Sequence, residues 1–144
     1  MNKICTDIEQ SKKLIELGID VNTADMFWDM AEPNKRRKPI VGPISDYFDM
    51  EDWAVPAWSL SALMNLLPSE FTEVGKSSTT IYQIHIRKDK FTDEVNLHQI
   101  AYGSYKWHED GGYTWSDMIN TGEKEDLLDA AFEMVCWLLE NKKL

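Results

Sequence analysis

The chain has 144 residues with 15 basic and 25 acidic side chains, and its formal net charge is −10 at pH 7. This length predicts a single domain over residues 1–144, large enough to form a hydrophobic core without a disulfide or a metal. The negative charge argues against nucleic-acid binding, which requires a positive field. No apolar run approaches the roughly 20 residues of a membrane span, so no membrane contact is expected.

The two cysteines, Cys5 and Cys136, lie at opposite ends of the chain, and no Cys-x-x-Cys pair occurs. Cys136 lies inside an apolar helical pattern, so we interpret both as free thiols of a reducing compartment. The N-terminal residues lack the apolar segment of a signal peptide. Together these features predict a cytoplasmic protein.

The first predicted element is a helix over Asp7–Leu17. Thr6 and Glu9 have the spacing of a capping box, in which each side chain bonds the backbone amide of the other residue. Gly18 is a suitable residue to follow the last turn. Farther along, apolar residues alternate over 24–30 and favour a short strand.

A basic segment bracketed by Pro33 and Pro39 follows. It is expected to form an exposed, solvated loop, and docking to an acidic protein partner is the second interpretation. Its four cations are Lys35, Arg36, Arg37 and Lys38. Residues 40–56, which contain several acids, are expected to be irregular.

Ser59 is predicted to cap a second helix, which ends before Pro68. The apolar residues of this helix recur at the spacing of a single helical face: Leu60, Leu63, Met64 and Leu67.

Two strands are predicted over 78–88 and 95–107, joined as an antiparallel hairpin by the polar residues between them. In the first strand the even positions from Tyr82 to Ile86 are apolar. In the second strand we expect the odd positions in the core: Val95, Leu97, Ala101, Tyr105 and Trp107. A turn signal at 110–113 allows an additional strand.

The last predicted element is a helix over 124–141 that is apolar around most of its circumference. Such a helix is either central to the core or presents one side to a partner. Trp137 lies on the widened apolar face, and a homodimer through this helix is one specific form of the second interpretation. The elements together predict an α+β fold in which two or three helices pack on a small antiparallel sheet centred on the hairpin 78–107.

No catalytic residue or cofactor-binding motif stands out, and no cofactor is expected. Residues 75–78 (Gly-Lys-Ser-Ser) resemble the end of a phosphate-binding loop, but the first glycine is missing and a strand follows where a helix is required. His85 and His98 are weak metal candidates. If Ile86 lay opposite Leu97, the two imidazoles would face each other about 5 Å apart at Cβ. No third ligand is indicated, so we expect solvated side chains and no metal site.

Six tryptophans divide into two groups. Those in apolar patterns are predicted to be core residues: Trp28, Trp58, Trp107 and Trp137. Trp53 and Trp115 lie in polar stretches near Pro or Gly, and tryptophan is frequent at binding hot spots. These two are therefore candidates for partner binding, the alternative being that they cover the edges of the core.

Three stretches together resemble a family of small uncharacterised proteins of Bacteroides-type bacteria and their phages or mobile elements. They are residues 23–28 (Thr-Ala-Asp-Met-Phe-Trp), 56–63 (Pro-Ala-Trp-Ser-Leu-Ser-Ala-Leu) and 129–141, which ends in Trp-Leu-Leu-Glu-Asn. The resemblance implies a phage or mobile-element context and assigns no catalytic residue. The order helix, hairpin, helix is also distantly similar to small phage sandwich domains.

These observations favour a small accessory protein that acts by binding an unidentified protein partner and not by catalysis. One alternative is an acidic immunity or anti-defence protein that neutralises a basic toxin or nuclease, with its acids gathered on one face. The other is an enzyme, whose pocket would hold two or more of a dispersed set of acids and histidines: Asp46, Asp49, His85, His98 and Glu109.

Overall fold

The computed structural model describes residues 3–30, 38–42 and 53–144. Three α-helices are found within these residues: α1 (Ile8–Glu16), α2 (Leu60–Leu66) and α3 (Leu127–Glu140). A short 3-10 turn, η1 (Val21–Thr23), follows α1.

The described strands form two antiparallel sheets. The three-stranded sheet has the order β2-β1-β3 and consists of β1 (Met26–Asp29), β2 (Pro39–Val41) and β3 (Ala54–Ala57). The four-stranded sheet has the order β4-β5-β6-β7 and consists of β4 (Glu70–Val74), β5 (Thr79–Lys90), β6 (Asn96–Trp107) and β7 (Tyr113–Asn120). The predicted hairpin thus becomes the central pair of a larger sheet, with slightly shifted bounds.

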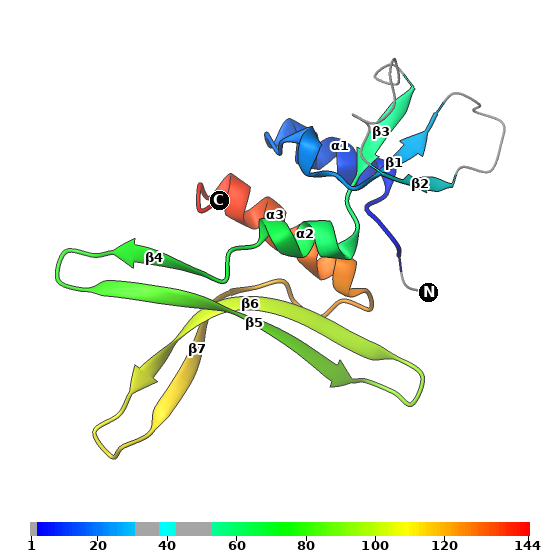
Figure 1. The fold of residues 1–144 in the computed structure, drawn as a ribbon. Coiled ribbons are helices and arrows are strands. Elements are labelled where there is room, and N and C mark those ends of the chain that lie inside the picture. The colour runs from blue at the N-terminus through cyan, green and yellow to red at the C-terminus, as the bar shows by residue number, and fades with distance from the viewer. Residues whose placement is uncertain (1–2, 31–37, 43–52) are drawn as a thin grey trace.

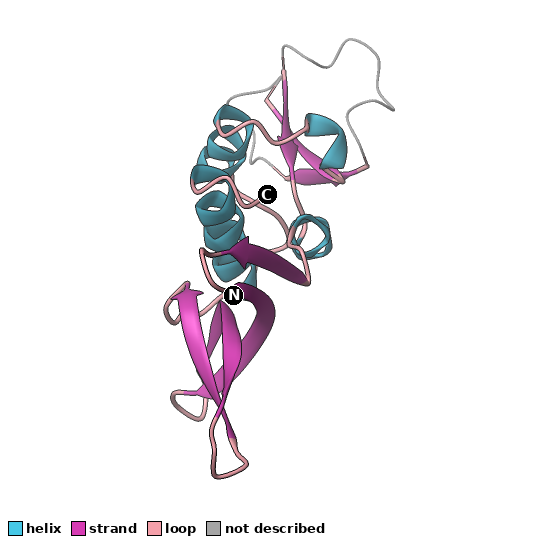
Figure 2. Cartoon of the chain, turned by 90° about the vertical axis from the view of Figure 1, so that its left-hand side faces the viewer, coloured by secondary structure: helices cyan, strands magenta, loops and turns pink. Residues whose placement is uncertain are grey.

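The two sheets lie at opposite ends of the described molecule, with helices between them (Figures 1 and 2). Helices α2 and α3 pack against one face of the four-stranded sheet, and α1 lies beside the small sheet (Figure 1). This arrangement confirms the predicted α+β class. The small sheet was not expected beyond its first strand, because β3 contains Pro56, a residue type that argues against a strand.

The main core gathers around α3, whose apolar side chains pack with those of α2, β6 and α1. Trp58, Tyr102 and Leu63 are fully buried there, as are side chains of α3 itself: Leu128, Met134, Val135 and Leu138. The wide apolar face of α3 is therefore used within the chain, as expected for a helix central to a core. No described helix is both long enough and apolar enough to cross a membrane.

The start of α1 differs from the prediction by one residue. Asp7 is the N-cap, and it forms a capping box with Gln10. Thr6 is instead buried, where its hydroxyl contacts the Ser11 hydroxyl at 2.7 Å and accepts from the Trp58 amide at 3.0 Å. Thr6 thus joins α1 to the segment before α2.

The predicted pairing of β5 with β6 is wrong. Ile86 lies opposite Ile100, three residues from Leu97, and Ile84 lies opposite Tyr102, so even positions of β5 pair with even positions of β6 and face the helices in both strands. Tyr102 is fully buried, whereas Tyr105 and Trp107, expected in the core, are each 55% exposed. Tyr105 and Trp107 lie at odd positions, on the face of the sheet opposite to α2 and α3, so no described helix covers these two side chains.

Candidate functional site

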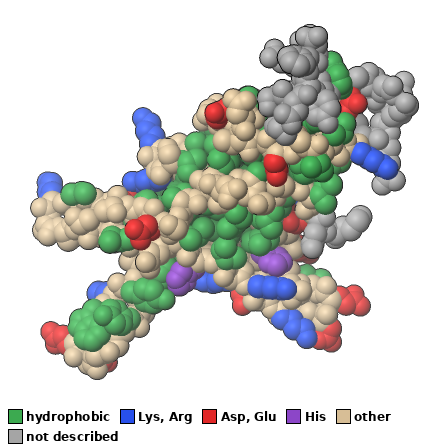
Figure 3. Space-filling model, in the orientation of Figure 1, with side chains coloured by type: hydrophobic (Ala, Val, Ile, Leu, Met, Phe, Trp, Pro, Cys, Tyr) green, Lys and Arg blue, Asp and Glu red, His purple; other side chains and the backbone are tan. Residues whose placement is uncertain are grey.

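The open face of the β6–β7 hairpin carries a cluster of aromatic side chains. We call it the aromatic patch and define it by Tyr105, Trp107, Tyr113 and Trp115 of the hairpin together with His85 of the neighbouring strand β5. The registers Tyr105↔Trp115 and Trp107↔Tyr113 place four of them directly opposite one another. Figure 3 shows apolar side chains gathered at the end of this hairpin.

The rings of the aromatic patch pack on one another. Trp107 and Tyr113 meet at 4.6 Å between ring centroids with planes inclined by 63°, and Tyr105 contacts Trp115 at 5.0 Å and 72°. These are the inclined arrangements that aromatic pairs prefer. His85 stacks flat on Trp115 with a centroid distance of 3.5 Å. The patch is therefore a continuous layer of rings.

Gly103 makes room for the indole of Trp115. A Cβ atom at this position would lie 2.7 Å from Trp115 Cζ2 and would also overlap the Ser116 carbonyl oxygen. Glycine inside a strand often marks such a close approach. Gly103 is the sequence signal that could have shown that Trp115 lies close against the sheet.

An ion pair holds the indole of Trp115 through its ring nitrogen. Arg87 contacts Asp117 with both terminal nitrogens, at 2.9 Å and 2.6 Å, and Trp115 Nε1 donates to the same carboxylate at 2.5 Å. The Arg87 hydrogen bonds are the main cause that lowers the pKa of Asp117 to about 2. Asp117 therefore stays ionised at neutral pH and fixes the indole in place.

The histidine pair expected from the sequence does not form. His85 lies opposite Ala101, and His98 lies opposite Lys88, so the two imidazoles are on opposite faces of the sheet. The observed pairing of β5 with β6 differs from the predicted one by three residues, and a shift by an odd number of residues moves a side chain to the other face of the sheet. Among the described residues, no group of three or more His, Cys, Asp or Glu side chains is placed to hold a metal ion.

The other candidates for partner binding are dispersed. Trp53 is partly buried against the Phe27 and Ala54 cluster, and Trp137 is partly buried against the main core. Lys38 is exposed. The remaining cations of the basic segment, Lys35, Arg36 and Arg37, lie outside the described residues, as do Asp46 and Asp49. Trp115 alone of this set belongs to the aromatic patch.

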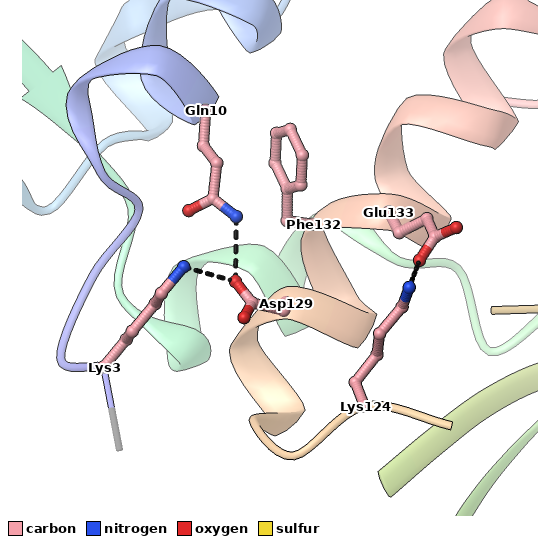
Figure 4. Close-up of a pocket in the computed structure, with 6 residues that line it drawn as sticks. All are labelled: Lys3, Gln10, Lys124, Asp129, Phe132 and Glu133. Atoms are coloured by element: carbon pink, nitrogen blue, oxygen red, sulfur yellow. Dashed lines mark hydrogen bonds and ion pairs between the residues drawn. The ribbon is translucent and has the colours of Figure 1, made fainter. Parts of the chain in front are cut away.

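A hollow of about 340 Å³ lies between the N-terminal segment, α1 and the start of α3 (Figure 4). Asp129 is at its centre and accepts from Lys3 Nζ and from Gln10 Nε2, both at 2.8 Å. Lys124 pairs with Glu133 at 2.9 Å on its other side. The charged groups are engaged with one another, so we assign this hollow a role in holding the N-terminal segment to α3.

Neither cysteine is placed as a nucleophile. Both side chains are buried, and this burial raises the pKa of Cys5 and of Cys136 to about 11. Because the thiolate is the reactive form, both thiols are protected at neutral pH.

Comparison with known proteins assigns no function to the aromatic patch. The sequence matches no family model and no curated protein, and the fold matches no solved structure. The resemblance to proteins of Bacteroides-type bacteria stays a prediction.

Proposed function

We propose that the protein acts by binding a protein partner through the aromatic patch. The observation that carries this proposal is the exposure of three large rings: Tyr105 and Trp107 are each 55% exposed and Tyr113 is 68% exposed. Such rings favour burial, and Tyr and Trp are enriched at the centres of protein interfaces. The setting that goes with the proposal is a small cytoplasmic accessory protein of phage or mobile-element origin.

The support beneath the rings favours a binding role. Trp115 is held by Gly103 on one side and by Asp117 through its ring nitrogen, and Tyr105 packs edge-on against Trp115. A partner would therefore meet rings that are already ordered, and ordering side chains is one of the costs that weaken association. A patch with this support binds more tightly than the same rings on a loose loop.

Photo-cross-linking tests the proposal. We would replace Trp107 with p-benzoylphenylalanine and irradiate the protein in a lysate of the source organism. The matched control carries the same group at Phe91, which is 69% exposed in the turn between β5 and β6, away from the patch.

We expect one protein to be cross-linked from position 107, to a lesser extent after the additional change Tyr113→Ala, and not from position 91. Equal capture from both positions, or no capture from position 107, would contradict the proposal.

A further inference from the structure

The four-stranded sheet is split at one end. The ladder between β5 and β6 stops at the pair Gln83–Gly103, while β5 stays paired with β4 and β6 with β7. Two hairpin arms therefore diverge from this point, as Figure 1 shows. We call the space between them the fork. It is a groove of about 660 Å³, lined among others by Ile81, Tyr105 and Lys106.

Backbone groups of β6 point into the fork. The His108 amide donates to the Gly112 carbonyl at 2.8 Å in the turn that joins β6 to β7. In an antiparallel pair the hydrogen-bonded residues alternate, so even positions of β6 bond β7 and odd positions point the other way. The amide and carbonyl groups of Tyr105 and Trp107 thus face the fork, beyond the last pair of the β5–β6 ladder.

The same alternation applies to β5. The Phe91 amide donates to the Val95 carbonyl at 3.0 Å, so odd positions of β5 are the ones that bond β6. Thr79 and Ile81 are odd positions beyond the end of the β5–β6 ladder. Within the part of the chain that the structure describes, the fork is therefore bordered on both sides by strand edges without a ladder partner. Open edges of this kind accept an additional strand.

We propose that the fork takes an extended segment of the protein partner, which adds as a strand to the open edge of β6. This inference rests on the proposed function, because it names the binding mode of the same hairpin. Odd side chains of both arms lie on the same face as the aromatic patch, so an added strand would lie beside Ile81 and Tyr105 there. These two side chains, 51% and 55% exposed, would then contact apolar residues at alternate positions of the segment.

The end of the hairpin selects for positive charge on the segment. Trp107 and Tyr113 present exposed ring surface there, and the turn that follows β6 carries Glu109 and Asp110. A Lys or Arg side chain would meet both aromatic faces and carboxylates at this point. The net charge of −10 also draws a basic segment toward the protein. The occupant is thus an extended segment with alternating apolar residues and a cation near one end.

Selection from random 12-residue peptides displayed on phage, with the full chain as target, tests this inference. We expect enriched sequences in which apolar residues alternate and are followed by Lys or Arg. The enriched peptide is then synthesised with N-methyl groups on one alternate set of amides or on the other. A strand that pairs with a single edge should lose at least tenfold in affinity with one set and little with the other. Equal tolerance of both sets, or no enriched peptide, would overturn the inference.

One pair of variants and one pair of peptides locate the binding. Ile81→Lys should weaken the peptide at least tenfold, whereas Val74→Lys, at an exposed position of β4 that does not line the fork, should not. Glu109→Gln should weaken a peptide with its cation and leave unchanged a peptide in which that cation is replaced by Gln. Hydrogen exchange should show protection of the Tyr105 and Trp107 amides in the complex. Protection elsewhere without protection of these amides would also overturn the inference.

The outcomes separate this inference from the proposed function. If peptides occupy the fork but the cellular partner is not captured at position 107, the proposed function fails and the fork remains a peptide site. If the partner is captured there but no peptide protects the fork amides, the partner contacts the rings alone and the inference fails.

Discussion

At the scale of single residues, Asp117 joins the sheet to the aromatic patch. Its carboxylate accepts hydrogen bonds from Arg87 and from the Trp115 indole. These contacts favour the ionised form, which is why its pKa is lowered to about 2 from the ordinary 3.8. The stabilisation is fully present above the ordinary pKa and is lost as the pH falls through the lowered one.

Replacing Asp117 with Asn should therefore lower the free energy of unfolding by about 1–2 kcal/mol at pH 7. Urea unfolding should show this loss reduced by about half at pH 3. Glu94→Gln, an exposed change in the turn between β5 and β6, is the control and should stay within about 0.5 kcal/mol at both pH values. A loss for Asp117→Asn that is the same at pH 7 and pH 3 would show that charge is not the cause.

Gly103 is the second residue on which the patch depends. The change Gly103→Ala should cost about 1–3 kcal/mol, because its methyl group would overlap Trp115 and the neighbouring backbone. It should also alter the near-ultraviolet circular dichroism, since Trp115 must move away from His85. Gly112→Ala, where the nearest atom to a Cβ would lie at 3.6 Å, is the matched control. An unchanged spectrum for Gly103→Ala would show that the indole of Trp115 does not lie against Gly103.

At the scale of elements, α1 depends on its N-terminal cap. Asp7→Ala removes the side chain that accepts from the Gln10 amide at 2.8 Å, and loss of such a cap costs about 1 kcal/mol. Glu9→Ala in the same turn leaves the cap intact and should cost only a few tenths of that amount. Thermal unfolding of both variants measures the difference. Equal destabilisation would assign the role to helix charge and not to the cap.

The helices were predictable from sequence because their ends and apolar faces are locally encoded. Ser59 caps α2, Gly18 follows α1 with a φ of +95°, and α3 begins beside acids. The register of β5 with β6 was not predictable in this way. Both faces of β6 carry apolar residues, such as Tyr102 on one and Tyr105 on the other, and a pattern of period two cannot choose between them.

The aromatic patch was predicted only in part. Trp115 was a candidate for partner binding, but Trp107 was assigned to the core. Which face of β6 is covered depends on where α2 and α3 lie (Figure 1), and Trp107 lies on the face opposite to the one that carries the buried Tyr102. That is a property of the assembled layers, and no local pattern reports it. The same holds for the fork, which exists because two hairpins of one sheet diverge.

At the scale of the whole molecule, the reactivity of the two cysteine thiols measures global unfolding of the chain. Cys5 forms an isolated antiparallel β-bridge with Ser59, the residue that caps α2, and Cys136 lies on α3. Burial raises both thiol pKa values to about 11 from the ordinary 9.0, which reduces the thiolate fraction about a hundredfold at pH 8.

Both thiols should therefore react with Ellman's reagent only as the protein unfolds, with rates that rise together with urea. Reaction in the absence of urea at the rate of a free thiol would contradict the described burial. Reaction of Cys5 well before Cys136 would show that the N-terminal segment opens separately from the core.

Binding through the aromatic patch can be measured as the affinity of the chain for the protein that is cross-linked from position 107. Calorimetric titration should show binding to the native chain that weakens at least tenfold on Trp107→Ala combined with Tyr113→Ala, because hot-spot rings each contribute more than about 1 kcal/mol. Phe91→Ala should leave the affinity unchanged, and far-ultraviolet circular dichroism should show that all variants keep the native fold. An unaltered affinity after loss of both rings would show that the partner does not bind through the aromatic patch.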